Sequence, residues 1–103
     1  MAARTSRGGA GAIAAFDLLG RRWALRVLWE LGEPAGTFRD LQQRCDGVSS
    51  SVLASRLSEL REARLVNERY ELTTTGRRLR QALEPVADWA TDWHRRRPRA
   101  KPR

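Results

Sequence analysis

The sequence predicts a mainly α-helical (α+β) domain, a winged helix-turn-helix with a short two-strand hairpin and flanking N- and C-terminal helices. Apolar residues recur at helical spacing through most of the chain. A tight turn at Asp46-Gly47 separates two of these helical segments. A short extended segment around residues 65–72 precedes a long last helix. The length of 103 residues suits one domain with one small core.

The segment from Ser49 to about Arg64 is the most informative helix. Leu53, Leu57 and Leu60 stand at i, i+4 and i+7, so they share one side and predict the buried face. Ser49 is the predicted N-cap, because its hydroxyl can accept a hydrogen bond from an early backbone N–H. The opposite face is mostly short hydroxyl side chains, with Arg56 at its edge: Ser51, Ser55, Ser58 and also Glu62. Small side chains let a helix approach another surface closely, as the second helix of a DNA-reading helix-turn-helix does.

Three shorter helices are predicted before it, over about residues 12–19, 23–31 and 38–44. Thr37 is the predicted N-cap of the third, and Asp40 three residues later gives a weak capping box. This third helix, the turn and the central helix form the predicted helix-turn-helix.

The hairpin and the last helix are predicted after the central helix. The stretch 65–72 has the composition of two short strands around a three-residue turn. Thr73 or Thr74 then caps a helix that runs to about residue 94. Pro85 should kink or split this helix, because proline removes one backbone hydrogen bond.

Composition divides the chain into three parts. Residues 1–11 are mostly Gly, Ala, Ser and Arg and are predicted to form a disordered arm. Residues 12–94 form the winged helix-turn-helix domain with its dimerisation helices. Residues 95–103 form a basic tail, also predicted to be disordered.

The charge balance favours a polyanionic partner. The formal net charge is +8, and Lys101 is the one lysine among 20 basic residues. Arginine binds phosphate with a planar fork and can read guanine at two points, which favours nucleic acid, although the tail carries much of the charge. No apolar run approaches the roughly 20 residues of a membrane span, and no signal peptide is recognisable. A cytoplasmic location is therefore expected, on the nucleoid when DNA is bound.

Short motifs occur in an informative order: Phe16-Asp17-Leu18-Leu19-Gly20-Arg21-Arg22-Trp23, Phe38-Arg39-Asp40-Leu41, Val48-Ser49 through Leu60, Leu72-Thr73-Thr74-Thr75-Gly76, and Trp89. With them, residues 12–93 resemble the HxlR-type transcriptional regulators of the MarR-like winged-helix superfamily. The resemblance implies a bacterial regulator that binds double-stranded DNA as a homodimer.

The sequence departs from the family pattern in three places. Arg22 replaces the lysine that precedes the tryptophan. The N-terminal cysteine that some members use to sense oxidants or electrophiles is missing, and Cys45 does not match it. The hairpin turn is very short, so deep minor-groove contact by a wing tip is not expected.

The predicted DNA contacts follow from the geometry of such domains, whose second helix enters the major groove with its N-terminal end. Serine hydroxyls can contact bases or phosphates, a valine can touch a thymine methyl, and arginines on neighbouring elements can bind phosphate. The predicted contacts are Arg39, Ser50, Ser51, Val52, Ser55, Arg56 and Arg69. For Arg56 an ion pair with Glu59 or Glu30 is the alternative role, and for Arg39 and Arg69 it is solvated surface charge.

The predicted dimer interface combines the first and last helices, where apolar and aromatic residues recur: Ile13, Phe16, Val86, Trp89 and Trp93. Trp89 and Trp93 stand at i, i+4 and can form one apolar patch. Two-fold pairing would place the two reading helices one DNA turn apart, about 34 Å. A planar aromatic ligand between tryptophans is the alternative.

No catalytic constellation, metal site or cofactor is predicted. Cys45 is expected to be a small buried residue, and His94 a surface residue. The alternative function is a winged-helix protein-interaction module with weak or no DNA binding. A single-strand-binding module should expose stacking aromatics, and Tyr70 is the one candidate. A small-molecule effector stays open.

Overall fold

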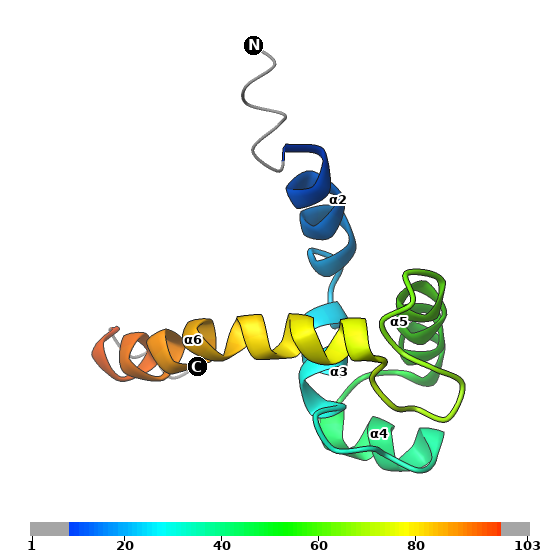
Figure 1. The fold of residues 1–103 in the computed structure, drawn as a ribbon. Helices are drawn as coiled ribbons and strands as arrows, with labels where there is room; N and C mark the ends of the chain where they lie inside the picture. Colours follow the sequence, from blue (N-terminus) through cyan, green and yellow to red (C-terminus); the bar gives the residue numbers. More distant parts are fainter. Residues whose placement is uncertain (1–8, 98–103) are drawn as a thin grey trace.

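The computed structural model describes residues 9–97, which form a helical domain with two projecting helices (Figure 1). The helices within this range are α2 (Ala10–Leu19), α3 (Ala24–Glu30), α4 (Phe38–Cys45), α5 (Ser50–Glu62) and α6 (Thr74–Arg96). Each predicted helix is present, with ends within two residues of those expected.

The core lies between α3, α4 and α5 and is closed by the segment after α5. Leucines 28, 41, 53, 57 and 60 are almost completely buried, as the helical spacing predicts. Leu65, Val66 and Leu72 cover the core from the α5–α6 connection. The short helices α4 and α5 thereby bury one face each and leave the other face in solvent.

Side-chain caps mark the start of three helices. The Oγ1 of Thr37 accepts from the Asp40 N–H at 3.0 Å, and the Oγ of Ser49 accepts from the Val52 N–H at 3.2 Å. The Oγ1 of Thr73, rather than that of Thr74, caps α6 by accepting from the Gly76 N–H at 3.0 Å. These caps satisfy donors that have no partner within the helix.

The prediction of a two-strand hairpin at residues 65–72 is wrong, because the described residues contain no strand there. One antiparallel bridge joins Val66 to Leu72, and no strand extends from it. The side chain of Asn67 explains this, because its Oδ1 accepts from the N–H groups of Arg69 at 2.8 Å and Glu71 at 3.1 Å. Tyr70 also has φ 60°, outside the extended region. The segment 67–71 is therefore a compact turn.

Pro85 does not divide α6, which runs without a break from Thr74 to Arg96. The predicted split is therefore wrong, and the kink that was the other predicted effect stays a prediction. Pro85 and Gln81 are both exposed, so water can bind the Gln81 carbonyl that loses its helical donor.

The predicted boundaries at residues 12 and 94 also shift. Helix α2 already begins at Ala10, and α6 continues through Arg96, so neither 10–11 nor 95–96 belongs to an unstructured arm or tail. Each of these helices extends two residues beyond the boundary that composition indicated. The rest of the predicted arm, 1–8, and of the predicted tail, 98–103, lies outside the described residues.

Helices α2 and α6 project from the core in different directions (Figure 1). Arg80 attaches α6 to α3, because its Nε donates to the Trp29 carbonyl at 2.8 Å and its guanidinium lies 4.0 Å from the centre of the Trp29 ring. Helix α2 buries none of its residues fully. Leu18 packs against the core from this helix, whereas Ile13 and Phe16 remain exposed.

Candidate nucleic-acid interface

A tight turn joins α4 to α5. Asp46 and Gly47 have φ values of 55° and 106°, both in the left-handed region that Gly, and less often Asp, adopts. Leu41 and Cys45 of α4 are buried with Leu53 of α5. The two helices therefore form one packed helix-turn-helix unit, with the start of α5 next to the turn.

Gln42 ties the start of α5 to α4. Its Nε2 donates to the Val48 carbonyl and to the Ser50 hydroxyl oxygen, each at 3.2 Å. Because a hydroxyl both accepts and donates, the Ser50 proton stays free to bind another group. Gln42 was not among the predicted site residues; its position next to Leu41, one turn before the chain reversal, is the signal that could have indicated it.

The outward face of α5 is made of small side chains that are exposed in the structure: Ser50, Ser51, Ala54, Ser55 and Ser58. Val52 is half-buried and packs partly against the core. A helix surface of hydroxyls and one alanine can approach a groove floor closely, since no long side chain holds it away. The predicted contacts Ser50, Ser51, Val52 and Ser55 thus lie together on the first turns of one helix.

Arg56, unlike the exposed serines of α5, is mostly buried and paired with a carboxylate. Its Nη1 lies 2.7 Å from Glu59 Oε1, and 15% of its side chain is exposed. The second oxygen of Glu59 lies 3.4 Å from Nη1 of Arg21, which follows α2. Glu30, the other predicted partner, pairs with Arg26 instead, at 2.8 Å. The structure contains the predicted ion pair with Glu59, and a contact between Arg56 and DNA stays a prediction.

Arg39 and Arg69 are exposed on separate elements. Arg39 is on the first turn of α4, and Arg69 is in the turn that replaces the wing. Neither forms an ion pair with any residue in the range 9–97. Both guanidinium groups are therefore available to bind an anion.

Comparison with known proteins matches residues 18–98 to the model of the HxlR-like helix-turn-helix family. The chain belongs to this family. The match includes α3, α4, α5 and α6, and so contains the whole helix-turn-helix unit.

Curated relatives of this HxlR-like chain carry matching descriptions. An uncharacterised HTH-type transcriptional regulator of Methanocaldococcus jannaschii, MJ0925, is 29% identical over 85 residues, which are 76% of this chain and 80% of the relative. YvaP of Bacillus subtilis, also described as an uncharacterised HTH-type transcriptional regulator, is 28% identical over 77% of this chain and 82% of its own. YodB of Bacillus subtilis, an HTH-type transcriptional regulator, is 28% identical over 74% and 77%. No solved structure matches the HxlR-like chain.

The predicted interface residues are exposed on the two projecting helices. Ile13 and Phe16 of α2 are 59% and 69% exposed, and Val86 of α6 is 54% exposed. Trp89 and Trp93 are 61% and 44% exposed and stack on each other, with ring centres 5.5 Å apart and planes 12° apart. Large exposed apolar side chains on α2 and α6 are a feature of contact surfaces.

Cys45 is fully buried in the HxlR-like domain. Burial raises the pKa of the Cys45 thiol, the negative charge of Glu30 adds to this, and Arg26 and Arg44 oppose it. The thiol is therefore protonated and shielded at neutral pH. We expect Cys45 in the folded protein to react with iodoacetamide at least about a hundredfold more slowly than in the urea-unfolded chain, since thiolate and access are both needed. Equal rates, followed by mass spectrometry, would contradict this.

Clusters of metal-ligating side chains and membrane-spanning helices are both absent from the described residues of this family member. Residues 9–97 contain no group of three or more His, Cys, Asp or Glu side chains placed to hold a metal ion. Within the same range, no helix has the length and apolar character needed to cross a bilayer.

Proposed function

We propose that the protein is a sequence-specific regulator of transcription that binds double-stranded DNA as a homodimer, with α5 in the major groove. The observation that carries the proposal is the exposed, small-residue face at the start of α5, held by the Asp46-Gly47 turn and by Gln42. Family membership and the descriptions of the relatives support it. Binding to chromosomal DNA would place the protein on the nucleoid, in the cytoplasm.

Contacts with the bases are assigned to Ser51, Val52 and Ser55. Most of the binding affinity is assigned to contacts between arginines and phosphates. Hydroxyl groups can bond to several base edges, so each serine discriminates weakly. The backbone N–H groups of the first turn of α5 add a favourable site for one phosphate. Arg39 and Arg69 lie on elements that flank α5 and supply charge to the backbone on either side.

Selection of binding sites from a random duplex library tests the proposal directly. We expect an enriched two-fold symmetric motif whose half-sites are centred about one helical turn apart, near 10 base pairs. The enriched duplex should compete for the protein at least about a hundredfold better than random duplex. Equal competition by both duplexes would contradict sequence-specific binding.

Arg39 and Arg69 provide a second test through salt dependence. We expect Arg39→Ala or Arg69→Ala to weaken binding to the selected and the random duplex alike, and to lower the slope of log K against log salt by about 1 for each lost phosphate contact. Gel-shift titrations at several salt concentrations measure both quantities. Glu68→Gln, at the position next to Arg69, changes the charge by one unit in the opposite direction and serves as the control that should not weaken binding. An unchanged slope would exclude the substituted arginine as a phosphate contact.

Substitution of Arg56 distinguishes between a contact of its side chain with a base and a structural role through its ion pair with Glu59. Because its guanidinium pairs with Glu59, we expect Arg56→Ala to lower the free energy of unfolding by about 1 kcal/mol, and to leave the selected DNA motif unchanged. Denaturation in urea and a repeated site selection measure the two effects. A relaxed motif at one base pair, with unaltered stability, would instead make Arg56 a base contact, with a loss of about 1–3 kcal/mol in affinity.

The alternative is a winged-helix module that binds a protein and has little affinity for DNA. One observation favours it: the wing is reduced to a compact turn with a single bridge. The site selection described above decides between the two functions, because a protein-binding module would enrich no duplex.

A further inference from the structure

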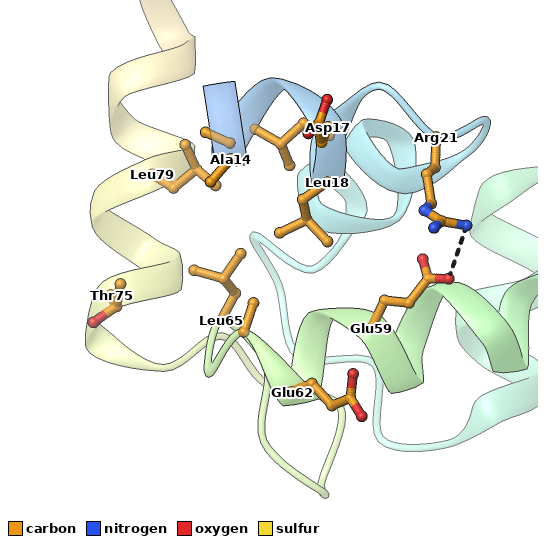
Figure 2. Close-up of a pocket in the computed structure, with 12 residues that line it drawn as sticks. Ala14, Asp17, Leu18, Arg21, Glu59, Glu62, Leu65, Thr75 and Leu79 are labelled. Carbon is orange, nitrogen blue, oxygen red and sulfur yellow. Dashed lines mark ion pairs between the residues drawn. The ribbon is translucent and has the colours of Figure 1, made fainter. Parts of the chain in front are cut away.

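An open groove of about 680 Å³ lies between α2, the end of α5 and the start of α6. Figure 2 shows Leu18, Leu65 and Leu79 around it, from three segments that are far apart in the sequence. Ala14 and Ala63 extend this apolar wall. A groove of this size with a mainly apolar wall is in the range of small-molecule sites.

The polar rim of the groove is acidic. It holds three carboxylates, those of Asp17, Glu59 and Glu62, and one arginine, Arg21. Glu59 is already neutralised, because its two oxygens pair with Arg21 and Arg56 (Figure 2 shows the first pair). Asp17 and Glu62 form no ion pair with any residue between 9 and 97.

Both unpaired carboxylates stand where a helix end adds to their negative charge. Asp17 is in the last turn of α2, which contains no basic residue, and Glu62 is the last residue of α5. Arg61, the basic residue in the last turn of α5, is directed to the Tyr70 ring, 5.6 Å from its centre. A helix C-terminus carries partial negative charge and is stabilised by cations. A chain of net charge +8 therefore contains one apolar groove with an unneutralised negative rim.

We propose that this groove binds a small lipophilic organic cation. Its aromatic or aliphatic body would cover the wall formed by Leu18, Leu65 and Leu79. Its charge would lie at the acidic rim beside Glu62, where the C-terminal end of α5 adds partial negative charge. The apolar wall disfavours an inorganic cation, and the unpaired carboxylates disfavour an organic anion.

The groove also touches the elements that the proposed function uses. Its wall contains the last turn of α5, whose first turn is the proposed DNA reader, and α2, part of the proposed dimer interface. An effect of the cation on DNA affinity would rest on the proposed function. Binding of the cation to the free protein does not, so the test uses the free protein and can fail independently of DNA binding.

The test compares two probes of nearly equal shape, the cation methyltriphenylphosphonium and the neutral triphenylphosphine oxide. In calorimetric titrations of the full chain we expect saturable binding of the cation at one site per chain, and at least about tenfold weaker binding of the neutral probe, since the rim interaction is lost. Equal binding of the two probes, or no saturable binding of the cation, overturns the proposal. A second copy of the chain would then be the remaining candidate to cover the groove.

Two variants locate the site. Glu62→Gln should weaken cation binding by roughly threefold to tenfold, as expected for an exposed charge pair, and Glu68→Gln, the same change in the turn at 67–71, should not. Ala14→Trp places a large ring in the groove from the exposed face of α2 and should abolish binding, with the helical circular dichroism unchanged. Wild-type affinity in either Glu62→Gln or Ala14→Trp overturns the assignment.

Discussion

Replacing Gly76 by alanine should destabilise the domain by about 3 kcal/mol or more. Gly76 is buried in the first turn of α6, and a Cβ there would overlap the carbonyl oxygen of Leu65 and lie 3.0 Å from its carbonyl carbon. These atoms are backbone, so they cannot rotate away as a side chain can. The same junction is held by Thr73, whose N–H donates to the Leu65 carbonyl at 3.0 Å and whose hydroxyl donates to the Arg64 carbonyl at 2.6 Å.

Urea denaturation followed by tryptophan fluorescence measures this loss as a lower midpoint with an unchanged slope. Gly11→Ala is the matched control, because Gly11 lies in α2 and an added Cβ meets no atom within 4 Å. We expect this control to keep or raise the stability by up to about 1 kcal/mol through helix propensity. Equal midpoints for the two variants would show that α6 can move away from Leu65 at little cost.

Local patterns in the sequence were sufficient to predict the helices and the core. The spacing of Leu53, Leu57 and Leu60 predicted the buried face of α5, and Thr37 and Ser49 were predicted as the caps that the structure contains. These features depend on residues within one or two helical turns of each other. Helical periodicity therefore carries enough information to place them.

The predictions that were wrong depended on competing contacts. Residues 65–72 have the composition of strands, but the Asn67 side chain accepts from the Glu71 N–H, which a longer ladder would pair with the Asn67 backbone carbonyl. Pro85 does not break α6, and because Gln81 is exposed, water can bind the carbonyl that loses its helical donor. Neither outcome is encoded in residue type alone.

The candidate site was predicted in part. The serines at the start of α5 follow from the cap and the helical face, and the structure places them together in solvent. The sequence analysis left Glu59 and Glu30 open as partners of Arg56, although helical spacing within α5 favours Glu59 and spacing within α3 pairs Glu30 with Arg26. The groove at Leu18, Leu65 and Leu79 depends on how three distant segments meet, which no local pattern shows.

Phe16→Glu should convert the proposed dimer to a monomer and lower its affinity for a two-half-site duplex at least about a hundredfold. Phe16 is 69% exposed, so a charged replacement costs the isolated fold little, but it would bury an unpaired carboxylate in an apolar contact between copies. Loss of pairing removes the second half-site contact, which in a dimer forms at high effective concentration. Sedimentation velocity and gel-shift titration measure the mass and the affinity.

Phe16→Glu should remove only the pairing of two copies, because α5 of each chain is unchanged. The monomeric variant should therefore still bind a duplex that contains one half-site, with the weak affinity of a single α5. Leu25→Glu is the control, since Leu25 is also exposed, at 41%, but lies on α3 outside the predicted interface. It should leave both mass and affinity unchanged. If wild-type protein sediments as a monomer at micromolar concentration, or if Phe16→Glu remains a dimer, the exposed residues of α2 do not form the interface. A persistent dimer of Phe16→Glu would leave Val86, Trp89 and Trp93 of α6 as the remaining predicted interface residues.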